Sequence, residues 1–111
     1  MGKFVVMNQF ENINNNGEVI SGATPYLKDN RAFRYGDGLF ETIRVIDGRP
    51  VNLQSHIDRL FQGATTLSFS LPSHYSLGFF KAEIGKLIGS NNIEGGAKLR
   101  LHMYRAGEGT Y

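Results

Sequence analysis

The hydrophobic period of this chain changes near position 53, from about two residues to about 3.6, and this change constrains the fold most strongly. Before it, Leu39–Ile46 alternates between two faces, as a half-buried strand does. After it, apolar residues recur at helical spacing: Leu53, Ile57, Leu60, Phe61, Ala64 and Leu67. The pattern predicts a strand followed closely by an amphipathic helix.

The connection between that strand and that helix carries turn signals. Asp47-Gly48 between two β-prone runs predicts a tight hairpin, with Arg49–Leu53 as the return strand. Pro50 suits an edge strand, because proline has no amide hydrogen for a ladder. Asn52 or Ser55 is expected to cap the helix that follows.

The beginning of the chain predicts further strands. Phe4–Met7 is a short β-prone run, and Glu18–Ile20 can return beside it. The segment Asn12–Gly17 lies between them and is the strongest turn signal, because asparagine and glycine tolerate positive φ. Ser21–Asn30, with its glycine and proline, is expected to be a connecting loop.

The end of the chain predicts a second helix and a last strand. Helical spacing relates Leu77, Phe80, Ile84, Leu87 and Ile88. Ser73 or Ser76 would begin that helix, and Gly89 and Asn91 are plausible stop residues. Ala97–Tyr104 alternates again. We therefore predict an α+β, two-layer small domain: a mixed, mostly antiparallel sheet with two helices, roughly 53–69 and 74–89, on one face.

Composition excludes several classes of protein. The 111 residues fit one small domain, and a net charge of +2 is a weak argument for nucleic-acid binding, although the pI is about 9.0. There is no cysteine, which excludes disulfides and thiolate metal sites and is compatible with the cytoplasm. No apolar stretch is long enough to span a membrane.

Several polar groups are candidates for a site, each with an ordinary structural alternative. Gly36 and Gly38 mark a bend where the backbone must come close to something; the ordinary alternative, which composition alone favours, is a tight loop that enters a strand. His56 and Arg59 lie on one helical face, where arginine can clamp a phosphate in a bidentate manner; a solvated arginine paired with Asp58 is the alternative. No second histidine stands at metal-site spacing.

The last strand presents a basic face. Lys98, Arg100, His102 and Tyr104 point the same way and suit an anion, or they form the solvent face of a sheet. The glycine-rich stretch 105–111 follows, and its ordinary interpretation is a frayed chain end.

Taken together and in order, these motifs resemble the N-terminal domain of the class IV (fold type IV) pyridoxal-phosphate enzymes. The family includes branched-chain and D-amino acid aminotransferases and aminodeoxychorismate lyases. The resemblance rests on the stretch 29–45, on Gly48-Arg49-Pro50 and on His56-Ile57-Asp58-Arg59-Leu60. It implies pyridoxal 5'-phosphate as cofactor, an amino acid or keto acid as substrate, and a homodimer. No nucleic-acid or membrane partner is expected, because the net charge is low and no stretch could span a membrane.

The resemblance also implies roles for single residues. Arg59 matches the arginine that binds the cofactor phosphate. Tyr35 and Phe40 match side chains of the substrate pocket, and Arg100 matches an arginine that meets a substrate carboxylate in branched-chain enzymes. The stretch 105–111 resembles the loop over the active site. Thr110 departs from the arginine that many D-amino acid enzymes and lyases carry there.

The lysine that forms the Schiff base, and therefore the catalytic residue, is absent from residues 1–111. In this family that lysine lies in a second, C-terminal domain, and the lysines present (Lys3, Lys28, Lys81, Lys86, Lys98) do not match its context. The sequence is therefore expected to be part of a longer enzyme and inactive by itself.

Two questions of function stay open at this point. Gly36-Asp37-Gly38 leans toward the lyase and D-amino acid branches, whereas Arg100 leans toward the branched-chain branch. The alternative to an enzyme is a free-standing α+β module that binds an anionic partner or RNA through Lys98, Arg100 and His102.

Overall fold

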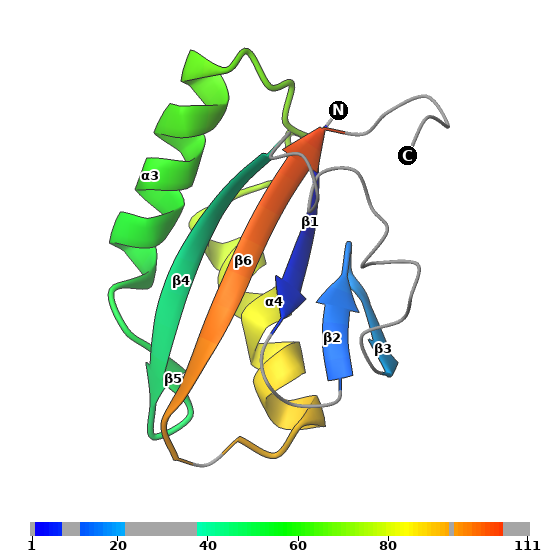
Figure 1. Ribbon diagram of the computed structural model, residues 1–111, viewed down its shortest axis with the longest axis vertical. Coiled ribbons are helices and arrows are strands. Elements are labelled where there is room, and N and C mark those ends of the chain that lie inside the picture. The colour runs from blue at the N-terminus through cyan, green and yellow to red at the C-terminus, as the bar shows by residue number, and fades with distance from the viewer. Residues whose placement is uncertain (1, 8–11, 22–37, 94, 106–111) are drawn as a thin grey trace.

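The computed structural model is a two-layer α+β domain, and it describes residues 2–7, 12–21, 38–93 and 95–105. One sheet of six strands, in the order β3-β2-β1-β6-β4-β5, forms the first layer, and helices α3 and α4 form the second (Figure 1). Every strand pair within the described residues is antiparallel. The predicted fold class is confirmed, and the mixture of strand directions is not found.

The elements have these bounds. The strands are β1 (Gly2–Met7), β2 (Asn12–Asn15), β3 (Glu18–Ser21), β4 (Gly38–Ile46), β5 (Arg49–Pro50) and β6 (Ala97–Arg105). The helices are α3 (Leu53–Thr66) and α4 (Leu77–Ser90). Neither helix is long and apolar enough to cross a bilayer.

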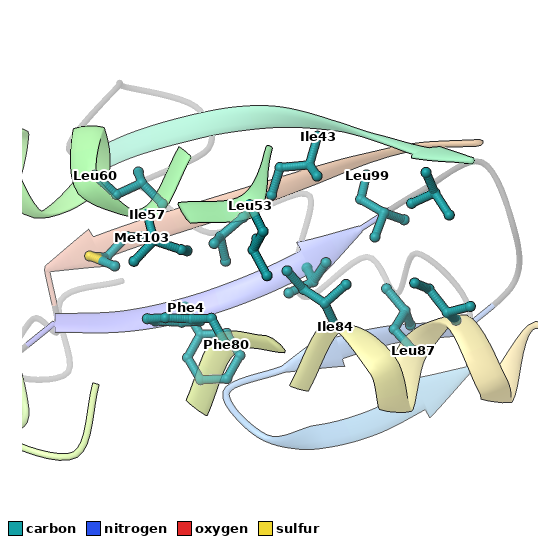
Figure 2. Close-up of a cluster of buried hydrophobic side chains, with 14 of the residues drawn as sticks. Phe4, Ile43, Leu53, Ile57, Leu60, Phe80, Ile84, Leu87, Leu99 and Met103 are labelled. Atoms are coloured by element: carbon teal, nitrogen blue, oxygen red, sulfur yellow. The ribbon is translucent and has the colours of Figure 1, made fainter. Parts of the chain in front are cut away.

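The core lies between the sheet and the two helices (Figure 2). From the sheet it takes alternate residues of three strands: Phe4 and Val6, Ile43 and Val45, and Leu99, Leu101 and Met103. From the helices it takes the predicted apolar stripes, including Leu53, Ile57, Leu60, Phe80, Ile84 and Leu87. The alternation predicted for β4 and β6 is thus confirmed on their buried faces.

Two local signals act as predicted. Asp47 and Gly48 both have positive φ, 51° and 74°, and Ile46 pairs with Arg49 across the turn, which makes a two-residue hairpin. Ser76 caps α4, because its Oγ accepts a hydrogen bond from the Phe79 amide at 3.1 Å. Asn91 follows the last residue of α4.

The segment Asn12–Asn15 was predicted to be part of a turn, and that prediction is wrong. It is strand β2, and the turn is confined to Asn16 and Gly17, which have φ of 54° and 98°. Asn14 is fully buried; its amide donates to the Glu83 carbonyl at 3.0 Å, and its Oδ1 accepts from the Gly17 amide at 2.8 Å. These hydrogen bonds satisfy a polar side chain where a strand normally places an apolar one.

The predicted return strand Arg49–Leu53 is also too long. β5 contains Arg49 and Pro50 alone and is an edge strand, as Pro50 suggested. Asn52 then takes a left-handed conformation, φ 56°, and α3 begins at Leu53. The expected side-chain cap is not formed by Asn52, and Ser55 lies inside the helix.

Candidate functional site

Three polar side chains meet where α3 crosses the edge of β4. Glu41 Oε1 lies 2.6 Å from Arg59 Nη2, 3.1 Å from Arg59 Nε and 2.6 Å from His56 Nδ1. Glu41 and His56 are largely buried, with side-chain exposures of 17% and 15%, whereas Arg59 is 59% exposed. A carboxylate that also binds an imidazole therefore anchors an arginine that reaches into solvent.

The protonation of this cluster follows from its geometry. Partial burial alone would raise the pKa of the Glu41 carboxyl, but the hydrogen bonds from Arg59 and His56 outweigh it and lower that pKa below its usual value. The hydrogen bond to Glu41 in turn raises the pKa of Arg59. Since an ionised carboxylate only accepts, His56 Nδ1 carries a hydrogen and donates it to Glu41. Arg59 Nη2 also lies 3.1 Å from His56 Nδ1, and this is a contact between two donors that share Glu41 Oε1 as their acceptor.

Phe40 and Arg100 form a second group on the other face of the sheet. The Arg100 guanidinium carbon lies 4.2 Å from the centroid of the Phe40 ring, which is a cation–π contact. Phe40 is 52% exposed, and Arg100 is also exposed. The stacked pair therefore offers an apolar surface beside a guanidinium whose edge is open to solvent.

The basic face predicted for β6 is smaller than its sequence suggested. Lys98 and Arg100 are exposed, but His102 and Tyr104 are buried, each 6% exposed. Burial lowers the pKa of His102 to about 4, and the positive charge of Arg100 adds to this effect. At neutral pH His102 is thus uncharged, and it does not contribute to an anion-binding face.

The lowered pKa of His102 predicts acid sensitivity. The unfolded histidine binds a proton with its usual pKa of 6.5, whereas the folded one does so only near 4. Stability is therefore greatest above pH 6.5 and falls as the pH drops toward 4, by roughly 2 kcal/mol between pH 7 and pH 5. Urea unfolding at pH 7 and pH 5 measures this loss.

His102→Gln should flatten the stability profile between pH 6.5 and 4.5. Glu41 contributes a loss of stability only below pH 4.5, which is the usual pKa of its carboxyl group. The loss of stability between pH 6.5 and pH 4.5 is therefore assigned to His102. His74→Gln is the matched control, because His74 is exposed. Equal slopes in the wild type and in His102→Gln would contradict the prediction.

The structure brings two of the predicted site residues together and places the third with a residue that was not predicted. Phe40 and Arg100 are brought together on one side of β4, and Arg59 lies with Glu41 on the other side. The two groups are linked because Phe40 and Glu41 are neighbours in the chain. Tyr35 and residues 106–111 of the glycine-rich stretch lie outside the described residues.

Gly38 confirms the close backbone approach that its sequence context predicted. A Cβ at this position would lie 2.6 Å from the Met103 carbonyl oxygen and 2.8 Å from His102 Nε2. The approach brings β4 against β6 just before Phe40, so glycine at 38 helps to set the position of the Phe40–Arg100 pair. Gly36 lies outside the described residues.

Gly38→Ala is therefore expected to destabilise the domain by about 1–3 kcal/mol, because the clash is with backbone that cannot move freely. Gly85→Ala is the matched control: nothing lies within 4 Å of its added Cβ, and alanine favours the helix interior. Thermal melts should show a lower midpoint for Gly38→Ala and an equal or higher one for Gly85→Ala. Identical shifts in both variants would contradict the account.

Glu41 is the site residue that the sequence did not assign. Arg59 was expected to pair with Asp58 or with water if it had no ligand, but its partner is Glu41, 18 residues away. One feature of the sequence could have indicated Glu41: it is an acidic residue on the same face of β4 as the apolar Leu39, Ile43 and Val45. No group of three or more histidine, aspartate or glutamate side chains that could hold a metal occurs in the described part of the chain.

Comparison with known proteins matches the chain to one family. Residues 38–111 match the model of the amino-transferase class IV family. Over 84 residues the chain is 33% identical to a D-alanine aminotransferase of Listeria monocytogenes serotype 4b. That match covers 76% of this chain and 28% of the relative.

Solved structures give the same result. A candidate 4-amino-4-deoxychorismate lyase from Legionella pneumophila matches with a TM-score of 0.57 and 30% identity, over 74% of this chain and 30% of that one. A branched-chain aminotransferase from Thermoproteus uzoniensis shares the fold, with a TM-score of 0.57 at 14% identity, over 96% of this chain and 42% of that one. The chain thus spans less than a third of the length of the D-alanine aminotransferase and of the lyase.

Proposed function

We propose, since the chain belongs to the class IV aminotransferase family, that it forms the N-terminal part of a pyridoxal-phosphate enzyme that acts on amino acids and keto acids. The observation that carries the proposal is Arg59, an exposed guanidinium that Glu41 and His56 hold in place on α3. Its role is to bind the phosphate of the cofactor.

The geometry of Arg59 fits a phosphate. Its contacts to Glu41 use Nε and Nη2, and Nη1 makes no hydrogen bond within the described residues. A guanidinium that is fixed along one edge can donate from the other edge to phosphate oxygens, with little loss of side-chain entropy on binding. Glu41 thereby orients the arginine, although its negative charge also reduces the attraction for the phosphate.

Pyridoxal phosphate, when bound, supplies an electron sink for negative charge at the substrate Cα. The chain's own residues would bind and orient. Arg59 would fix the phosphate, Arg100 would meet a substrate carboxylate, and Phe40 would hold Arg100 by stacking and cover part of the apolar wall. We assign Tyr35 to the same wall from its place in the family motif.

The catalytic lysine is proposed to lie in a second, C-terminal domain. The described lysines are surface groups: Lys3, Lys81, Lys86 and Lys98 are all exposed. Lys86 pairs with Glu83 at 2.8 Å and donates to the Gly17 carbonyl. None of them is therefore placed in a desolvated pocket of the kind that activates an amine. A homodimer in the cytoplasm completes the proposal.

Two reactions remain candidates for the whole enzyme. Identity of about a third to D-alanine aminotransferases favours amino transfer with a D-amino acid. Identity of 30% to the Legionella protein favours aminodeoxychorismate lyase as the second candidate. Branched-chain specificity is supported by Arg100 alone, which is exposed and stacks on Phe40.

The test is an activity assay of the protein encoded by the complete reading frame. With pyridoxal phosphate, D-alanine and 2-oxoglutarate, we expect pyruvate to form as the amino group is transferred. L-Leucine in place of D-alanine tests the branched-chain alternative, and pyruvate released from aminodeoxychorismate without a keto acid assigns the lyase. The 111-residue chain, as the negative control, should be inactive in all three assays. No activity of the complete protein in any of them would contradict the proposal.

A further inference from the structure

An open groove lies at the hairpin end of β4 and β6, away from Arg59. Its volume is about 340 Å³, and it is lined by Arg44, Val45, Ile46, Gly96, Ala97 and Lys98. Ile46, which is 44% exposed, supplies an apolar side chain to the groove. The charged side chains in the lining are those of Arg44 and Lys98, and both are cations.

The two cations stand directly opposite each other. Arg44 and Lys98 are register partners in the antiparallel pair of β4 and β6, and both side chains are exposed. Side chains at such positions have Cβ atoms only about 4.5–5.5 Å apart, and like charges there destabilise a sheet. Within the part of the chain that the structure describes, neither forms an ion pair with a carboxylate.

We propose that this groove binds the oxyanion of a small molecule, a carboxylate or a phosphate, between the Arg44 guanidinium and the Lys98 ammonium. An anion between the two cations relieves their repulsion and gains charge-assisted hydrogen bonds. The arginine fork can meet two oxygens of the anion, and the lysine can meet a third oxygen of a phosphate or share one of the two oxygens of a carboxylate. Ile46 would contact the carbon skeleton that carries the anion.

This site is separate from the Glu41–His56–Arg59 cluster, and it lies beside the Phe40–Arg100 pair. Arg59 belongs to the cluster on α3, whereas Arg44 and Lys98 share the opposite face of the sheet with Phe40 and Arg100. Along β6, Lys98 is two residues from Arg100, or roughly 7 Å. The inference does not require a cofactor, so it can fail or hold independently of the proposed function.

The test is a titration of the isotopically labelled 111-residue chain, followed by amide chemical shifts. The probes are inorganic phosphate, succinate and acetate, each added at constant ionic strength that is maintained with sodium chloride. We expect saturable shifts at Val45, Ile46, Ala97 and Lys98. Arg44→Gln and Lys98→Gln should each weaken binding about tenfold, since each removes a charge-assisted contact.

The variants are expected to remain folded, because each removes one of two repelling charges, and melting temperatures without added anion should be unchanged or higher. Lys81→Gln makes the same charge change on α4, and Arg59→Gln removes the candidate phosphate ligand on α3. Neither should alter the groove shifts. Saturation by phosphate alone or by the carboxylates alone identifies the source of the oxyanion. Non-saturable shifts, or equal weakening by Lys81→Gln or Arg59→Gln, would overturn the inference.

Discussion

Phe80→Ala is expected to lower the free energy of unfolding by about 3–5 kcal/mol, the largest stability effect we predict. Phe80 is fully buried on α4. Its ring centroid lies 5.3 Å from Phe4 on β1, 5.0 Å from Tyr75 and 5.1 Å from Phe79. The truncation leaves a cavity at the contact between the two layers, and a small domain has only about 5–15 kcal/mol to lose.

Urea unfolding of the 111-residue chain measures this effect. Leu77→Ala is the matched control, because Leu77 lies on the same helix but is 37% exposed, and its loss should be below about 1 kcal/mol. A Phe80→Ala variant within 1 kcal/mol of wild type would mean that α4 does not pack on the sheet as described.

Arg59→Lys is expected to weaken pyridoxal phosphate binding by about 10- to 100-fold in the protein encoded by the complete reading frame. Lysine retains the charge but not the planar fork, so it cannot contact Glu41 through two nitrogens and still present a second donor edge to phosphate. Titration of the apo-protein with the cofactor measures the change.

Arg49→Lys is the control for that titration. Arg49 is an exposed arginine on edge strand β5, outside the Glu41–His56–Arg59 cluster. The same chemical change there should leave cofactor affinity as it is. Equal losses in both variants would point to a general effect of arginine replacement rather than to a ligand.

The parts of the fold that the sequence predicted are those with strong local signals. The alternation of β4, the Asp47-Gly48 turn and the Ser76 cap each depend on a few adjacent residues, and each forms as expected. Strand β2 was missed because it depends on distant partners. Asn14 is held there by the carbonyl of Glu83, 69 residues away, and no local pattern reports such a hydrogen bond.

The candidate site was likewise predicted only in the parts that have a local sequence signal. Arg59 was predicted as a ligand from its motif, but its partner Glu41 was not predicted, because only the packing of α3 against β4 brings the two side chains together. For β6, alternation correctly assigned Lys98 and Arg100 to an open face. It did not predict that His102 and Tyr104, on the same face, are buried. Alternation gives the face on which a side chain lies, whereas burial depends on what packs against that face.

The most direct test of the central claim, that Arg59 binds the cofactor phosphate, compares pyridoxal phosphate with pyridoxal. Both should be titrated into the apo-protein of the complete reading frame, in wild type and in Arg59→Lys. The phosphate should strengthen binding in wild type, and this advantage should fall at least about tenfold in the variant, with pyridoxal affinity nearly unchanged. An equal phosphate advantage in both proteins would contradict the claim.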